Sequence, residues 1–269
     1  MNKQEKLKKV LSQYNRVAIA FSGGVDSTFL LWFAVHTLGS DHVLAFTATS
    51  PSFPADESAW AKKIAHELGV VHRLIPTNEL DDPIFNANPP DRCYHCKKHI
   101  FENMKRMAKE YDITTLLFGA NLDDQNDYRP GHRAAIECGI IAPLVECCYT
   151  KADIRAESQT AGLPTWNKPA APCLATRIPY NESITKEKLV AIEHAEHFLH
   201  EQGFPIVRVR HHGRMARIEL PNDDLERLFA QRATIDQYLK TLGFTWVSLD
   251  LSPFQSGGLN VVLNEKDVT

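Results

Sequence analysis

The first half of the chain alternates short apolar runs, rich in β-branched and aromatic residues, with segments of helical periodicity. Such alternation is typical of a parallel sheet, because the chain must cross back through a helix before the next parallel strand begins. The pattern therefore predicts an α/β core, a parallel sheet with helices on both faces. The strands are expected at 17–21, 42–46, 70–75, 115–118 and 139–142, and the helices at 27–36, 55–68 and 96–110.

The second half predicts a smaller unit. A helix capped at Thr150 is expected to end at Gly162, and residues 163–185 form a proline-rich segment without periodicity. Irregular segments of this length are usually functional or join domains. Helices are expected at 185–203 and 224–242, and strands at 205–210, 215–220 and 246–251. We therefore predict two domains, residues 1–170 and a C-terminal α+β domain at 171–269.

Composition limits the classes of protein to which the chain can belong. The 269 residues are 43% hydrophobic, which is enough for a full core, and the net charge of −3 does not favour a nucleic-acid partner. The N-terminus is charged, and no stretch approaches the roughly 18 apolar residues of a membrane span. We expect a cytoplasmic protein without a membrane partner, whose six cysteines serve as thiols or metal ligands rather than in disulfides.

A glycine turn follows the first predicted strand. Residues 20–28, AFSGGVDST, are called the phosphate loop below. Gly23 and Gly24 allow a tight turn and close approach of an anion to the N–H groups at the helix start. The loop lacks the lysine of a G-x-x-x-x-G-K-[ST] motif and does not fit G-x-G-x-x-G. It predicts a phosphate site of another type, and the alternative is a tight turn without a ligand.

Three cysteines are candidates for chemistry. Cys173 lies four residues before Arg177, whose guanidinium would favour the reactive thiolate if the fold brings them together. The alternative is a small buried side chain. Cys93 and Cys96 form a C-x-x-C motif, which is compatible with an iron-sulfur cluster, a redox pair or zinc. The remaining cysteines are expected to pack in the core, and they are Cys138, Cys147 and Cys148.

Two further groups of polar residues suit a ligand. The turn after the strand at 115–118 would place its side chains at the carboxyl edge of the sheet, where α/β proteins bind ligands. A solvated turn is the alternative. Arg208 and Arg210 alternate along a predicted strand and so share one side, an arrangement that suits a phosphate. The residues of the turn are Asn121, Asp123, Asp124, Asp127 and Arg129.

The motifs together resemble a known family. SGGVDS at 22–27 resembles the PP-loop of ATP pyrophosphatases, which split ATP between the α and β phosphates. The ordered set, with NPPDRCYHCKK, GANLDDQNDYRPG, APCLATRIPY and VRVRHHGRMARIEL, resembles the LarE family over nearly the whole chain. These are ATP-dependent sulfur transferases that help to build the nickel-pincer nucleotide cofactor of lactate racemase.

The resemblance implies a reaction and its participants. ATP with Mg²⁺ would adenylate a carboxylate of a pyridinium dicarboxylate mononucleotide, and Cys173 would help to convert it to a thiocarboxylate. The sulfur would come from Cys173 itself, left as dehydroalanine, or from a sulfide on a [4Fe-4S] cluster held by Cys93, Cys96 and Cys173. The family also implies a homohexamer.

The resemblance also implies site residues. Cys173, Asp26 and Arg177 would be catalytic. Nucleotide and substrate would be bound by Ser22, Gly23, Gly24, Val25, Asp26, Ser27, Thr47, Asn121, Asp124, Arg129, Arg208, Arg210 and Glu219. Three alternatives stay open from the residues: an amide-forming PP-loop ligase, a tRNA thiolase, and a nucleotide-binding module without turnover.

Overall fold

The computed structural model describes residues 1–126, 130–255 and 257–263. It divides into two compact units, one formed by Met1–Thr77 with Asp91–Ala171 and the other by Asn78–Pro90 with Pro172–Thr269. None of the helices in the described ranges is long and apolar enough to cross a membrane. The candidate residues Asp127 and Arg129 lie outside the described residues.

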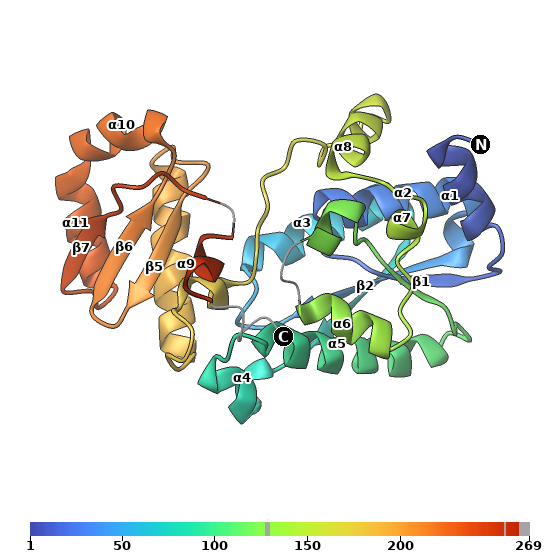
Figure 1. Cartoon of the computed structure of the whole chain (residues 1–269), viewed down its shortest axis with the longest axis horizontal. Helices are drawn as coiled ribbons and strands as arrows, with labels where there is room; N and C mark the ends of the chain where they lie inside the picture. The colour runs from blue at the N-terminus through green and yellow to red at the C-terminus, as the bar shows by residue number, and fades with distance from the viewer. Residues whose placement is uncertain (127–129, 256, 264–269) are drawn as a thin grey trace. The chain divides into compact units, whose positions relative to one another are not determined.

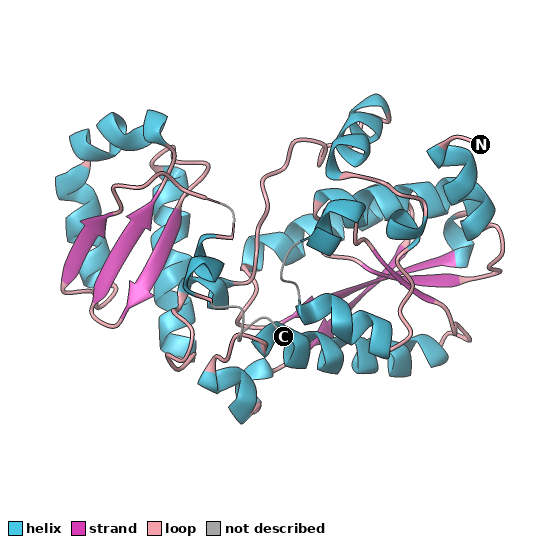
Figure 2. Ribbon diagram, viewed as in Figure 1, coloured by secondary structure: helices cyan, strands magenta, loops and turns pink. Residues whose placement is uncertain are grey.

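The first unit is built on a four-stranded parallel sheet (Figure 1). Its order is β3-β2-β1-β4, and the strands are β1 (Val17–Ala20), β2 (Val43–Thr49), β3 (Val71–Pro76) and β4 (Leu116–Phe118). Helices cover both faces, with α2 and α3 on one side and α5 and α6 on the other (Figure 2). The predicted α/β fold is thereby confirmed. The helices are α1 (Lys3–Leu11), α2 (Val25–Leu38), α3 (Ala55–Glu67), α5 (Arg92–Lys109), α6 (Pro130–Glu137), α7 (Pro143–Glu146) and α8 (Lys151–Thr160).

The strand expected at 139–142 is reduced to one bridge. Ile141 pairs with Leu117 in parallel, and no longer ladder is formed there within the described residues. Gly139 turns the chain just before this point with a φ of 65°. Pro143 then begins α7, and because proline has no N–H to donate, the ladder cannot continue.

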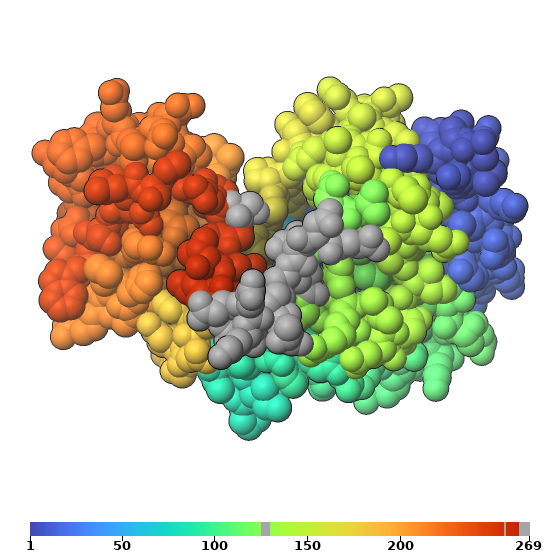
Figure 3. Space-filling view, viewed as in Figure 1, coloured from blue at the N-terminus to red at the C-terminus, as the bar shows by residue number. Residues whose placement is uncertain are grey.

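Helix α2 is apolar around most of its circumference, which fits a helix covered on several sides. Phe29, Leu30 and Leu31 are all fully buried. Next to α2, helix α8 begins at the predicted cap, where Thr150 and Asp153 form a capping box. Lys3 of α1 pairs with Asp153, and Figure 3 shows the N-terminal segment, in blue, beside yellow-green surface of the same unit. The start of α8 is therefore held from two directions.

The second unit contains a three-stranded sheet with the order β5-β6-β7. Strand β5 (Arg208–His212) is antiparallel to β6 (Met215–Glu219), which pairs in parallel with β7 (Trp246–Leu249). The helix expected at 224–242 is broken at Gln231, whose N–H contacts carbonyls of the preceding turn. The helices are α4 (Pro83–Ala87), α9 (Lys186–Glu201), α10 (Leu225–Ala230) and α11 (Arg232–Thr241), with the short η4 (Leu174–Arg177).

The segment Asn78–Pro90 joins the second unit through hydrogen bonds to residues far along the chain. The buried Asn88 side chain donates to the carbonyl of Pro179 at 2.7 Å, and Asn181 donates its N–H to the carbonyl of Asn88 at 2.9 Å. Ile184 likewise donates to the carbonyl of Asn86 at 2.9 Å. Local periodicity does not encode such contacts, and the predicted division at 170/171 did not assign this segment to the C-terminal domain.

Candidate active site

The phosphate loop joins β1 to α2, with Gly24 as the residue that precedes the first turn of the helix. Gly23 has a φ of 71°, and a Cβ atom there would lie 3.2 Å from Ala61. Ser22 and Ser27 place their hydroxyl oxygens 3.1 Å apart beneath the turn. The loop therefore requires glycine for its conformation and presents amide and hydroxyl donors at the positive end of a 14-residue helix.

The end of β4 lies directly against the start of α2. A Cβ atom on Gly119 would be 2.8 Å from the nitrogen of Ser27 and 2.9 Å from the carbonyl carbon of Asp26. Strand order reverses between β1 and β4, since β2 and β3 continue on the other side of β1. Ligands of open α/β sheets bind in the crevice at such a reversal, beyond the carboxyl ends of the strands.

Asp26 is the main charged group of this crevice. Its Oδ2 accepts from Lys151 Nζ at 2.7 Å and from Asn121 Nδ2 at 3.4 Å. The backbone N–H of Lys151 is fixed in turn by Asp123 at 2.8 Å. Burial raises the pKa of Asp26, and the positive charge of Lys151 opposes that rise.

The second oxygen of Asp26 suits a metal ion. Oδ1 is buried and has no hydrogen-bond partner among the described residues. Mg²⁺ prefers carboxylate oxygens and is usually held by one or two of them together with phosphate oxygens of the substrate. The residues present therefore fit a magnesium-nucleotide, and Asp26 as its protein ligand stays a prediction.

The turn after β4 is closed by its own side chains. Asn121 donates its N–H to Asp124 Oδ2 at 3.0 Å, and Asp123 donates its N–H to Asn121 Oδ1 at 2.9 Å. Asn121 and Asp124 are both buried, so the alternative of a solvated turn is wrong for these two. Their contacts orient the Asn121 amide toward Asp26.

Thr47 is tied to the phosphate loop and to His72. Its hydroxyl donates to the Phe21 carbonyl at 2.6 Å and lies 2.8 Å from His72 Nε2. Because threonine has one hydroxyl proton, His72 must donate from Nε2. Burial lowers the pKa of His72, which favours the neutral ring. Contact of Thr47 with a nucleotide stays a prediction.

We expect Gly119→Ala to distort this crevice. The new methyl would meet backbone atoms of α2, which cannot rotate away as a side chain would. Overpacking of this kind costs about 1–3 kcal/mol of stability, and ATP should bind more weakly because the loop is displaced. Calorimetric titration with Mg-ATP measures the affinity. Gly258→Ala is the control, since its Cβ would approach nothing closer than 3.6 Å, and equal affinities for the two variants would contradict the prediction.

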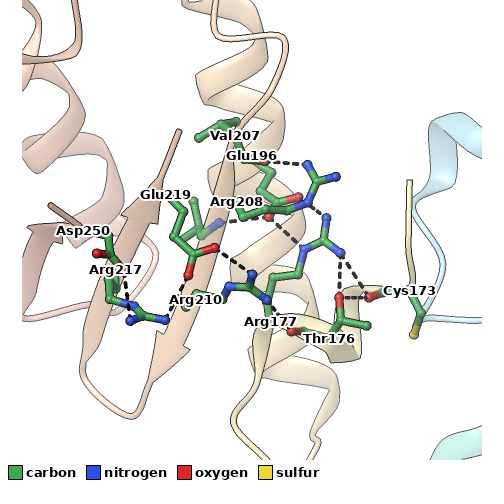
Figure 4. Close-up of polar contacts among 11 residues, drawn as sticks. Cys173, Thr176, Arg177, Glu196, Val207, Arg208, Arg210, Arg217, Glu219 and Asp250 are labelled. Carbon is green, nitrogen blue, oxygen red and sulfur yellow. Dashed lines mark hydrogen bonds and ion pairs between the residues drawn. The ribbon is translucent and has the colours of Figure 1, made fainter. Parts of the chain in front are cut away.

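The second unit holds a buried cluster of charged side chains (Figure 4). Arg177 binds Glu196 through two hydrogen bonds of 2.9 and 2.7 Å, and both side chains are almost fully buried. Arg210 pairs with Glu219 at 2.7 Å and donates to the Thr176 carbonyl at 2.7 Å. The contacts of these two arginines hold η4 against β5.

Positive charge exceeds negative charge in this cluster. Four guanidinium groups gather with three carboxylates, those of Glu196, Glu219 and Asp250. Burial, and then the positive charge of Arg177, lowers the pKa of Arg208 to about 10. The Nε atom of Arg210 is buried without a partner among the described residues. A phosphate would neutralise the excess charge and use such donors. The four arginines are Arg177, Arg208, Arg210 and Arg217.

Cys173 is attached to this cluster through its main chain. Its carbonyl accepts from Arg177 at 3.2 Å and from the Thr176 hydroxyl at 2.8 Å. The half-buried side chain points its sulfur away from the Arg177 guanidinium (Figure 4). The donors of this guanidinium are directed to Glu196, to the Thr176 hydroxyl and to the carbonyls of Pro172 and Cys173, so the observed contacts of Arg177 position the cysteine backbone. A direct effect of Arg177 on the thiolate stays a prediction.

The other cysteines differ in their surroundings. Cys93 and Cys96 lie in the first turns of α5 in the first unit, whereas Cys173 belongs to the second. In the described parts of the chain, no three His, Cys, Asp or Glu side chains are grouped so as to hold a metal. Cys138 and Cys147 are buried as expected, but Cys148 is exposed with a φ of 58°, so its predicted packing role is wrong.

Most predicted residues gather in two places. The first unit holds the phosphate loop, which includes Asp26, together with Asn121 and Asp124. The second unit holds Cys173, Arg177, Arg208, Arg210 and Glu219. Sequence reasoning missed Lys151 and Glu196. Lys151 follows the predicted cap at Thr150, a signal that could have placed it at a helix start. Glu196 offered no signal, since its partner Arg177 lies in another element.

Comparison with known proteins agrees with this geometry. A family model described as asparagine synthase matches residues 4–87, which include the phosphate loop. An NH₃-dependent NAD⁺ synthetase of Methanococcoides burtonii is 26% identical over 54% of the chain and 57% of its own length. An uncharacterized protein of Synechocystis is 42% identical over 98% of the chain and 99% of its own length.

One relative decides the family. The pyridinium-3,5-bisthiocarboxylic acid mononucleotide synthase of Lactiplantibacillus plantarum is 37% identical over 98% of the chain and 95% of its own length. The chain belongs to the LarE family. The expected ATP-dependent, sulfur-transferring enzyme is thereby confirmed. LarE membership disfavours the amide ligase, the tRNA thiolase and the module without turnover.

Proposed function

We propose that the chain adenylates a carboxylate of a pyridinium dicarboxylate mononucleotide and converts it to a thiocarboxylate. The observation that carries the proposal is the pair of sites: a phosphate loop with Asp26 in one unit, and Cys173 beside a buried arginine cluster in the other. The pyridinium-3,5-bisthiocarboxylic acid mononucleotide synthase of Lactiplantibacillus plantarum, to which the chain is similar, supports this choice of substrate. A homohexamer in the cytoplasm stays a prediction from the family resemblance.

Adenylation would use the first site. The substrate carboxylate attacks the α-phosphorus of ATP, the bond to the bridging oxygen breaks, and pyrophosphate leaves. The N–H groups of the loop and the hydroxyls of Ser22 and Ser27 would bind the leaving pyrophosphate. A magnesium ion held by Asp26 would neutralise charge on the phosphates.

Sulfur transfer would use Cys173. Its thiolate attacks the acyl carbon of the adenylate, and AMP leaves as a thioester forms. Removal of the Cα proton of residue 173 then breaks its Cβ–S bond, which releases the thiocarboxylate and leaves dehydroalanine. The substrate's phosphate would bind the arginine cluster, where Arg208 and Arg210 are nearly fully buried.

A [4Fe-4S] cluster is the second sulfur source in this proposal. Cys93, Cys96 and Cys173 would supply its three thiolates, and the described residues do not assemble them into one group. We therefore derive no step through the cluster. Iron and acid-labile sulfide in protein purified without oxygen would distinguish this source from the Cys173 sulfur.

The test of adenylation is pyrophosphate release. We expect the protein with Mg-ATP to release pyrophosphate only when the pyridinium dicarboxylate mononucleotide is added, and to form AMP in equal amount. Asp26→Asn should slow this release by at least about tenfold, because the loss of one charge weakens the metal site. Formation of ADP, or pyrophosphate release independent of the acid, would contradict the proposal.

A further inference from the structure

The segment between α8 and Cys173 is fixed to the first unit as far as Lys168. Arg155 of α8 donates to the carbonyls of Trp166 at 2.8 Å and Lys168 at 3.1 Å. The N–H of Lys168 donates to the Thr165 carbonyl at 3.0 Å, and Thr165 is fully buried. The backbone that leads to the cysteine is therefore held in place five residues before it.

The side chain of Lys168 reaches the phosphate loop. Its Nζ donates to the Gly23 carbonyl at 3.3 Å and to Glu57 Oε2 at 2.8 Å, and it lies 5.3 Å from the centre of the Trp60 ring. Only 18% of this side chain is exposed. Residues more than a hundred positions apart are thus joined by one ammonium group.

The hydrogen bond from Lys168 to the Gly23 carbonyl bears on phosphate binding. The peptide between Gly23 and Gly24 is planar, so fixing its carbonyl also fixes the direction of the Gly24 N–H on the opposite side. That N–H stands at the N-terminus of α2 and donates to the Ser22 hydroxyl at 3.3 Å, a long contact that a phosphate oxygen could replace. A donor held in advance toward an anion costs no reorganisation during the reaction.

We propose that Lys168 is a positioning residue that couples the phosphate loop to the segment carrying Cys173. Its ammonium orients the Gly24 N–H for pyrophosphate and anchors the start of the cysteine segment. Five extended residues span at most about 18 Å, so a fixed Lys168 limits how far the Cys173 backbone can lie from it. The inference rests on the proposed function, since it assigns the anchoring to that reaction.

The test compares Lys168→Met and Lys168→Arg with Lys63→Met. Lys63 is a matched control, because it also lies over the Trp60 ring, at 5.5 Å, and pairs with Glu67 of α3, whereas among the described residues no hydrogen bond or ion pair joins it to the loop. The first readout is thiocarboxylate formed per pyrophosphate released. We expect Lys168→Met to lower this ratio about tenfold, because a misplaced cysteine leaves the adenylate to water. Lys168→Arg should recover part of it, and Lys63→Met should match the wild type.

The second readout is hydrogen exchange of the Trp166 and Lys168 amides, which does not depend on the reaction. Lys168→Met should exchange these amides faster than the wild type, and Lys63→Met should not. An unchanged ratio or unchanged exchange in Lys168→Met would overturn the inference. Wild-type protein that forms no thiocarboxylate would instead refute the proposed function, while faster exchange in Lys168→Met would still support the anchor.

Discussion

Cys173→Ala is expected to abolish thiocarboxylate formation while pyrophosphate release continues. The loss should be complete, below about one thousandth of the wild-type rate, because the variant lacks the proposed nucleophile or cluster ligand. The fold should survive, since the contacts of Cys173 with Arg177 and Thr176 use its carbonyl oxygen, which alanine retains. Mass spectrometry of the product, beside a pyrophosphate assay, measures both steps.

Cys148→Ser is the matched control for this thiol. Cys148 is exposed, so removal of its sulfur should leave both steps unchanged. Thiocarboxylate formed by Cys173→Ala at a rate near that of the control would show that sulfur reaches the adenylate by another route.

Arg177→Met is expected to cause the largest loss of stability. It leaves Glu196 as a buried charge without its bidentate partner, and the carbonyls of Pro172 and Cys173 lose a donor. Breaking a buried pair in this way typically costs about 3–5 kcal/mol. Hydrogen exchange of amides in α9 and β5 measures the effect in the unit concerned.

The control for this variant is Arg217→Met. It removes the same charge from the same cluster, where Arg217 pairs with Glu219 and Asp250, but 37% of its side chain is exposed. We expect a smaller loss than for Arg177→Met, because solvent screens the charges of a partly exposed pair. Equal losses in the two variants would mean that burial of the Arg177 pair does not determine the stability of this unit.

The sequence predicted those features that depend on local order along the chain. The alternation of apolar runs predicted the sheet, and Gly23 and Gly24 predicted a turn whose φ at Gly23 is 71°. Arg208 and Arg210 were expected on one side of a strand, and both lie in the buried cluster. Periods of two and 3.6 residues, and glycine at a strand end, are local signals.

Features that depend on distant contacts could not be predicted in this way. Lys151 meets Asp26 across 125 positions, and Asn88 joins the second unit through Pro179. The surroundings of Arg177 also depend on such a contact, since its guanidinium binds Glu196 of α9. No pattern of residue types specifies which of several carboxylates an arginine will bind.

The most direct test of the central claim is one turnover by protein purified without oxygen, with intact mass and iron content measured before and after. We expect thiocarboxylate, AMP and pyrophosphate in matching amounts. The chain should then lose one sulfur and two hydrogens from residue 173, or keep its mass and contain iron with bound sulfide. Thiocarboxylate produced by a chain of unchanged mass that contains no iron would contradict the account.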